Sequence, residues 1–170
     1  KSAIAYGKAL ENLSAKSGVA ATELAKIQYA AMFENVNPAE LANSIRFLQR
    51  AMSEAAETAE NEYATAFRQA GISTEGIAGR DVLSVFRELS TFMRGSASDA
   101  TKTGIAMQLL GRSGQDFIPL LKNGATWLDA MGREASRLGL VWDGFAEKAD
   151  KVNDNITRIK QGILGIGVST

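Results

Sequence analysis

The sequence predicts an all-α fold, a bundle of about seven helices with one long helix and a C-terminal helix that has heptad patterning. Three observations carry this prediction. The 170 residues include 27 Ala and only two Pro, a composition that favours helices. Apolar residues recur at spacings of three and four along most of the chain. The 16 Gly stand mainly between these periodic segments, where they end one helix and allow the next to begin.

The composition also narrows the classes of function. Lys and Arg number 19, as do Asp and Glu, so the net charge is zero and phosphate-driven binding of nucleic acid is disfavoured. The chain has no Cys and no His, which removes disulfides, thiolate chemistry, and the commonest general base and metal ligand. It also lacks an apolar run of about 18 residues that would predict a membrane-spanning helix. We therefore expect no enzyme activity, no cofactor, no metal site and no sequence-specific nucleic-acid partner.

The first elements are two helices joined by a short corner. Apolar spacing predicts a helix over residues 2–17, which Gly18 ends. A second helix is predicted over residues 22–34, with its inward face formed by Leu24, Ile27 and Ala31. Such a pair resembles a helix-turn-helix. An ordinary αα-corner is the preferred interpretation, because the second-helix surface offers a poor DNA-binding set, namely Lys26, Gln28 and Glu34.

The longest helix is predicted over residues 38–70. Asn37 is a good N-cap, Pro38 suits the first helical position, and Glu40 can reach back to the cap. The helix would span roughly 50 Å. Its stripe alternates at four and three and then shifts slightly in phase: Leu41, Ile45, Leu48, Met52, Ala55 and Ala59, followed by Tyr63 and Phe67. This stripe either packs within the same domain, which we prefer, or forms a coiled-coil surface for a partner.

Three further helices are predicted beyond a Gly-containing loop at residues 72–79. The first covers about 80–94, and its broad apolar face is expected at the centre of the core: Val82, Val85, Phe86, Leu89, Phe92 and Met93. The second begins at a capping-box-like pair, Ser96 and Asp99, and runs to about residue 110 with Ile105, Ala106 and Leu109 inward. The third covers 125–138, with Leu128, Met131, Ala135 and Leu138 inward, and Gly139 ends it.

The most distinctive stretch is a tight corner over residues 106–124. Ser113 and Asp116 have capping-box-like spacing, and Pro119 is expected to kink or end the short apolar helix that follows. A catalytic or phosphate-binding role is disfavoured, because no strand precedes the glycines, no His can activate the Ser, and the Lys of a P-loop is missing. We interpret it as a packing corner comprising Gly111, Arg112, Ser113, Gly114, Phe117, Ile118, Pro119, Leu120 and Leu121.

A heptad-patterned helix is predicted over residues 143–170, after the short apolar strap 140–142. Ile at both core positions favours coiled coils of three or four strands, so trimeric self-association is one interpretation. Packing on the domain and disorder are the alternatives. The stripe that would carry self-association is Val152, Ile156, Ile159, Ile163 and Ile166. We divide the chain into a compact helical domain, residues 1–142, and this helix, which we expect to lead into the rest of a longer chain.

Several segments resemble the tape measure proteins of long-tailed phages and prophages. The clearest is Ala106-Met-Gln-Leu-Leu-Gly-Arg-Ser-Gly114 with Ile118-Pro-Leu-Leu121, followed by Ala135-Ser-Arg-Leu-Gly-Leu-Val141. Weaker segments are Leu13-Ser-Ala-Lys-Ser-Gly18, Glu23-Leu-Ala-Lys-Ile-Gln-Tyr-Ala-Ala31, Leu48-Gln-Arg50 and Ala66-Phe-Arg-Gln-Ala-Gly-Ile-Ser73. The resemblance covers residues 10–164. It departs from the family at residues 53–63, where relatives often carry a Gly-containing break, and this leaves open whether one helix or two occupy that part.

The resemblance implies a structural virion protein, the tail-length ruler that takes part in tail assembly and genome ejection. Its expected location is the tail lumen of the virion, and the host cytoplasm during assembly. The implied partners are the tail tube protein, tail-tip or hub proteins, tail assembly chaperones and other copies of itself. Because the predicted breaks fold this segment back on itself, we expect an anchoring or docking domain attached to the ruler. The alternative is a generic helical protein–protein interaction domain unrelated to phage.

Overall fold

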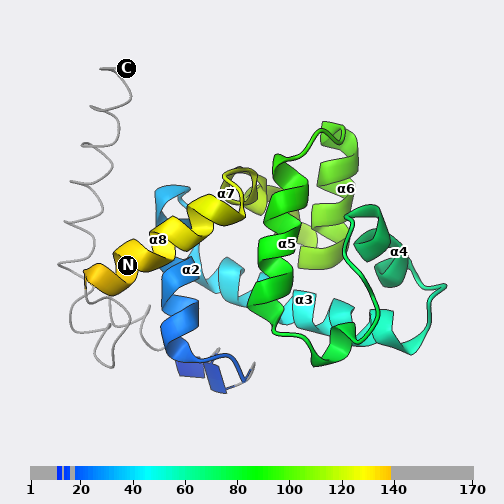
Figure 1. Cartoon of the computed structure of the whole chain (residues 1–170), viewed down its shortest axis with the longest axis horizontal. Helices are drawn as coiled ribbons and strands as arrows, with labels where there is room; N and C mark the ends of the chain where they lie inside the picture. Colours follow the sequence, from blue (N-terminus) through cyan, green and yellow to red (C-terminus); the bar gives the residue numbers. More distant parts are fainter. Residues whose placement is uncertain (1–10, 13, 16–17, 139–170) are drawn as a thin grey trace.

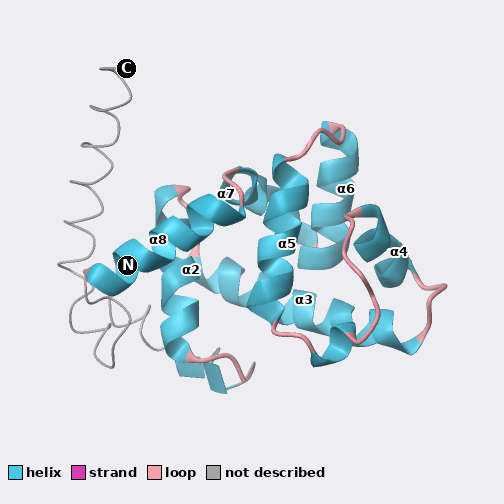
Figure 2. Ribbon diagram, viewed as in Figure 1, coloured by secondary structure: helices cyan, strands magenta, loops and turns pink. Residues whose placement is uncertain are grey.

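The computed structural model describes residues 11–12, 14–15 and 18–138 of the chain. Within these residues the fold is all-α, as predicted, and no strand is present (Figures 1 and 2). The helices are α2 Ala21–Phe33, α3 Pro38–Glu57, α4 Glu62–Gln69, α5 Val82–Arg94, α6 Asp99–Leu110, α7 Ile118–Lys122 and α8 Ala125–Arg137, and two 3-10 turns are η1 Ile77–Gly79 and η2 Arg112–Phe117. No helix in the described part of the chain is both long enough and apolar enough to cross a bilayer.

Several predictions lie outside the described residues. They are the helix over residues 2–17, apart from a few of its positions, the strap at 140–142, the heptad-patterned helix over 143–170 with its self-association stripe, and the domain boundary between residues 142 and 143.

The helix α2 begins and ends close to its predicted bounds, and Leu24, Ile27 and Ala31 are buried as expected. It ends in a Schellman motif: Asn35 adopts a positive φ of 56°, and the Val36 amide donates to the Ala31 carbonyl at 3.1 Å. The placement of Gln28 on the surface is wrong, because its side chain is only 2 % exposed. The helix packs against both α8 and α3, so more than one of its faces is covered.

The start of α3 is confirmed, because the Asn37 Oδ1 atom accepts a hydrogen bond from the Ala39 amide at 2.9 Å. The single long helix over residues 38–70 is wrong. The chain leaves the helix after Glu57 and re-enters it at Glu62, so two helices occupy this part. Folding back lets α4 pack on α3 and α6 and bury Ala64, Ala66 and Phe67, which one straight helix could not do. The stripe of α3 packs within the domain.

The helix α5 lies at the centre of the bundle and contacts α3, α7 and α8. Its predicted inward residues are buried, except that Phe92 is half-buried. The predicted cap of α6 is wrong: the N-cap is Ser98, whose Oγ accepts from the Thr101 amide at 3.2 Å, and Ser96 lies two residues too early. Ser98 has the extended backbone of a cap, φ −62° and ψ 153°, immediately before the first helical residue.

The two ends of the bundle are built differently (Figure 1). At one end, α8 crosses α2, and an edge-to-face aromatic row joins them: the Tyr29 and Phe33 rings lie 5.3 Å apart, and the Phe33 and Trp127 rings 6.4 Å apart. At the other end, α4 packs beside α6. Between the two ends lie α3 and α5, which carry six of the twelve largest fully buried side chains. The structure thus sets α2 and α8, from opposite ends of the described chain, side by side.

Candidate functional site

The predicted corner joins α6 to η2 and α7 through two glycines with distinct constraints. Gly111 has φ 87° and ψ −172°, a backbone conformation that is essentially restricted to Gly. Its amide closes α6 by donating to the Met107 carbonyl at 3.1 Å. A Cβ on Gly111 would lie 3.3 Å from the Phe47 ring of α3, so the corner is also crowded from outside.

Gly114 is required by close packing instead of by its dihedral angles. A Cβ there would lie 2.1 Å from the Ala106 carbonyl oxygen and 2.9 Å from the Met107 nitrogen, both backbone atoms of α6. The turn η2 therefore lies directly on the backbone of α6, with no room for a side chain between them. The Gly114 amide donates to the Gly111 carbonyl at 2.8 Å, which closes the turn.

The capping predicted from Ser113 and Asp116 is wrong. No side-chain cap is present on η2 or α7, because residues 112–117 form a 3-10 turn that continues directly into the short helix. Pro119 does not kink or end α7: it lies in the first turn, where its missing N–H is not needed. Phe117, Leu120 and Leu121 are buried, Ile118 is half-buried, and Arg112 is exposed. The Ser90 hydroxyl of α5 donates to the Leu121 carbonyl at 2.6 Å and ties the corner to the core.

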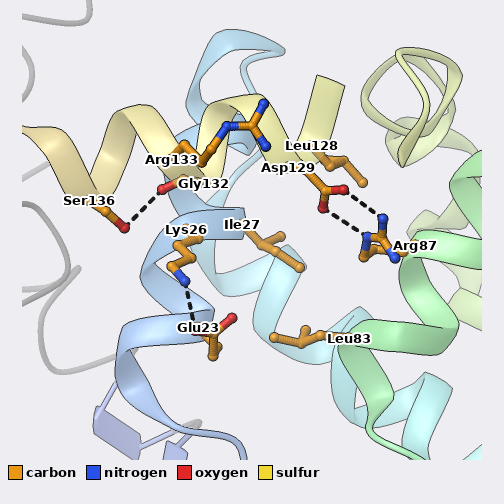
Figure 3. A pocket seen from close by; sticks show the side chains of 10 residues that line it. All are labelled: Glu23, Lys26, Ile27, Leu83, Arg87, Leu128, Asp129, Gly132, Arg133 and Ser136. Carbon is orange, nitrogen blue, oxygen red and sulfur yellow. Dashed lines mark hydrogen bonds and ion pairs between the residues drawn. The ribbon is translucent and has the colours of Figure 1, made fainter. Parts of the chain in front are cut away.

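A groove of about 400 Å³ lies between α2, α5 and α8 (Figure 3). Its floor is apolar and is formed by one residue from each helix, Ile27, Leu83 and Leu128. Its rim is polar and carries five charged side chains: Glu23, Lys26, Arg87, Asp129 and Arg133.

Four of the five rim charges neutralise one another. The Lys26 Nζ atom lies 2.8 Å from the Glu23 Oε1 atom. Arg87 of α5 makes a bidentate pair with Asp129 of α8, with Nε–Oδ1 and Nη2–Oδ2 distances of 2.8 and 2.6 Å, and this hydrogen bonding raises the pKa of Arg87. Arg133 has no ion-pair partner among the described residues. The rim is therefore positive by one charge, at Arg133.

Both carboxylates that line the groove are held in ion pairs. Its only hydroxyl, Ser136 Oγ, donates to the Gly132 carbonyl at 3.1 Å, one turn earlier in α8. Across the described part of the chain, no group of three or more acidic, His or Cys residues could hold a metal ion. An apolar floor with a charged rim suits the binding of another protein segment.

Sequence reasoning missed this groove because its residues come from three separate helices. The Arg87–Asp129 pair spans 42 positions, and no periodic pattern links the two residues. The one local signal is the Glu23 and Lys26 pair, three residues apart on one helix face. The corner and the groove are different sites, although α7 and α8 follow each other directly.

A scan against protein-family models, a search of the curated proteins and a search of the solved structures found no match to this chain.

Proposed function

We propose that this chain is a helical docking domain of a structural phage-tail protein of the tape measure class, which acts in tail assembly and genome ejection. The proposal is supported by the position of the residues that resemble the tape measure family. The segment with the clearest resemblance covers the corner, and its two glycines have physical reasons to be glycines. Gly111 has a glycine-restricted backbone, and Gly114 lies against the backbone of α6.

The compact fold favours docking over measuring within this proposal. A helical ruler gains about 1.5 Å of length for each residue only while the chain runs straight. The described chain reverses direction repeatedly, and α2 packs against α8 although about ninety residues separate them. The segment would therefore serve as a folded head that holds the ruler to another tail component.

The groove between α2, α5 and α8 is the surface we assign to that docking. Its floor of Ile27, Leu83 and Leu128 would receive apolar side chains, and Arg133 would pair with a carboxylate of the partner. The partner would be the tail tube protein, a tail-tip or hub protein, a tail assembly chaperone or a second copy of this chain.

Deletion of residues 20–140 from the parent gene tests the docking role. The deletion removes 121 residues, so an extended ruler would shorten the tail by roughly 180 Å. A folded docking domain would instead leave tails that fail to assemble, or tails of nearly unchanged length that eject DNA poorly. Electron microscopy of tails from the deletion phage gives their number and length. Shortening by the full 180 Å in otherwise normal tails would contradict the proposal.

A matched pair of charge reversals tests the groove. Arg133→Glu changes the rim, whereas Arg46→Glu makes the same charge change at an exposed position of α3 outside the groove. We expect Arg133→Glu to weaken association with tail-assembly proteins, and Arg46→Glu to leave it unchanged, in pull-downs from phage-infected cells. Equal association of both variants would assign docking to another surface.

The groove by itself would also suit a helical interaction domain unrelated to phage. The genes next to the parent gene distinguish the two functions. Neighbouring genes for a major tail protein and a tail chaperone would favour the tail function, and a locus without tail genes would favour the unrelated interaction domain.

A further inference from the structure

Residues 38–69 contain nothing that forbids one continuous helix, yet they form two. Apart from Pro38 at the first helical turn, this stretch has neither Pro nor Gly. The break at residues 58–61 consists of Thr, Ala, Glu and Asn; Ala and Glu are strong helix formers, and Thr and Asn are only weakly unfavourable. The backbone at Thr58 and Asn61 is ordinary extended chain. Helix propensity therefore does not account for the break, which side-chain hydrogen bonds and packing stabilise.

One side chain, Asn61, ties the two helices together at the break. Its Nδ2 atom donates to the Glu54 carbonyl in the last turn of α3, and its Oδ1 atom accepts from the Ala64 amide of α4 at 2.8 Å. Asn61 thus bonds one carbonyl that the end of α3 leaves open and one amide that the start of α4 leaves open. A continuous helix would satisfy both groups through its own backbone, so this side chain is needed only in the folded-back form.

The helix α4 is short, and it packs on α6 beside an open cleft. Its eight residues are too few for a helix that is stable alone, and its buried side chains are Phe67 and two alanines. A cleft of about 550 Å³ lies between α4 and α6. Gly104 of α6 borders this cleft, and a Cβ there would meet no atom within 4 Å other than its chain neighbours and the nearby backbone of α6. Release of α4 from α6 therefore has to expose Phe67 and the two alanines, and little else of α4 is buried.

We propose that the α3–α4 corner is a two-state hinge, in which α4 leaves α6 and extends α3 into one helix over residues 38–69. Such a helix has 32 residues and a length of roughly 48 Å. The apolar stripe of α3 already continues in sequence to Tyr63 and Phe67, so straightening would present it as one surface and would uncover the face of α6. The hinge does not rest on the proposed function, and its test needs no phage component.

Distance measurement between two spin labels tests the hinge in the full chain. The sequence has no Cys, so Arg50→Cys and Arg68→Cys give two labels without background, and both positions are exposed. In a continuous helix these positions are separated by 18 residues, or about 27 Å. In the folded-back form α4 packs on α3, so the labels lie closer together. Pulsed electron paramagnetic resonance measures the distribution of label distances and so gives the fraction of chains in each form.

Three variants of the labelled chain make the test decisive. Asn61→Ala removes both ties, and we expect the fraction of chains at about 27 Å to rise by about 2- to 30-fold, the effect of a lost helix cap. Asn61→Asp keeps the acceptor for Ala64 but loses the donor to Glu54, and should give a smaller rise. Ala59→Pro forbids a continuous helix and should abolish the long distance.

Two results would overturn the hinge. One is the absence of a peak near 27 Å in Asn61→Ala, whether the labels stay close or give the broad distribution of an unfolded chain. The other is persistence of that peak in Ala59→Pro, which would mean that the long distance does not come from a straight helix. Circular dichroism of each variant, with a thermal unfolding curve, separates straightening from loss of the fold.

Discussion

Two glycines in or next to α6 have opposite surroundings and make opposite predictions. A Cβ on Gly114 meets the Ala106 carbonyl oxygen at 2.1 Å, and neither backbone can move without opening the corner. We expect Gly114→Ala to lower the free energy of unfolding by more than about 2 kcal/mol. Gly104 lies within α6 in open space, so Gly104→Ala should raise it by up to about 1 kcal/mol. Urea unfolding followed by circular dichroism measures the unfolding free energy of each variant. Equal changes in the two variants would contradict the close contact at Gly114.

The hydroxyl of Tyr29 makes a second prediction at the residue scale. Tyr29 of α2 is fully buried, and its hydroxyl has no hydrogen-bond partner among the described residues. Burial, with a smaller effect of Glu134, raises its pKa to about 12. A raised pKa favours the neutral phenol in the folded state. The titration of Tyr29 therefore leaves the free energy of unfolding unchanged below about pH 10. It lowers this free energy by up to roughly 2–3 kcal/mol as the pH rises from about 10 to about 12.

The Tyr29→Phe variant isolates this effect from the titration of lysines. It should be more stable than the parent by about 1 kcal/mol at pH 8, because an unpaired buried hydroxyl is removed. Its advantage should grow further between pH 10 and 12, where the parent loses stability. Urea unfolding of both proteins at pH 8, 10 and 11.5 gives the difference, and a constant difference across this range would contradict the raised pKa.

At the scale of single elements, the start of α6 separates two serines that sequence reasoning could not distinguish. Ser98 caps the helix through the Thr101 amide, whereas Ser96 is exposed and lies before the cap. We expect Ser98→Ala to destabilise the protein by about 1 kcal/mol and Ser96→Ala to change it by less than about 0.5 kcal/mol. Thermal unfolding of the two single variants is sufficient. A larger loss with Ser96→Ala would place the cap two residues earlier.

Local patterns therefore predicted the existence of the helices better than their ends. The cap at Asn37 is encoded within four residues and was predicted from them, as was the apolar face of α5. The break after Glu57 was not predictable from apolar spacing, because two features outside that spacing stabilise it: Asn61 bonds across the break, and Phe67 is buried where α4 packs on α3 and α6. The 3-10 turn over residues 112–117 was missed for the same reason: Gly114 fits the backbone of α6, a contact that no sequence period expresses.

The charged groove shows the same limit at the level of the site. Its residues come from α2, α5 and α8, and only the Glu23–Lys26 pair is local in sequence. The composition excludes chemistry based on His or Cys, but it does not predict that Arg87 pairs with Asp129. The glycines and apolar residues of the predicted packing corner, by contrast, are consecutive in the chain, so this stretch could be singled out from the sequence alone.

At the scale of the whole molecule, α2 and α8 form one unit packed on the rest of the bundle. Each helix packs more extensively on the other than on α3 or α5, and the groove of about 400 Å³ separates them from part of α5. The Arg87–Asp129 pair and the apolar floor cross this boundary. An arrangement of this kind favours sub-global opening, in which α2 and α8 leave the bundle together while α3, α5 and α6 stay folded.

Hydrogen exchange of the native protein tests this cooperative unit. We expect the most protected amides of α2 and α8 to share one opening free energy, lower than that of α5 and α6. Arg87→Ala removes an exposed bidentate pair, worth about 0.5–1 kcal/mol, so these amides should exchange about 2- to 5-fold faster in both α2 and α8, with α6 unchanged. The matched control is Arg50→Ala, which breaks an exposed ion pair within α3 and should leave α2 and α8 unaffected. Faster exchange in α8 alone would show that the two helices open separately, and the groove would then be the surface of one mobile helix instead of a boundary between two folded units.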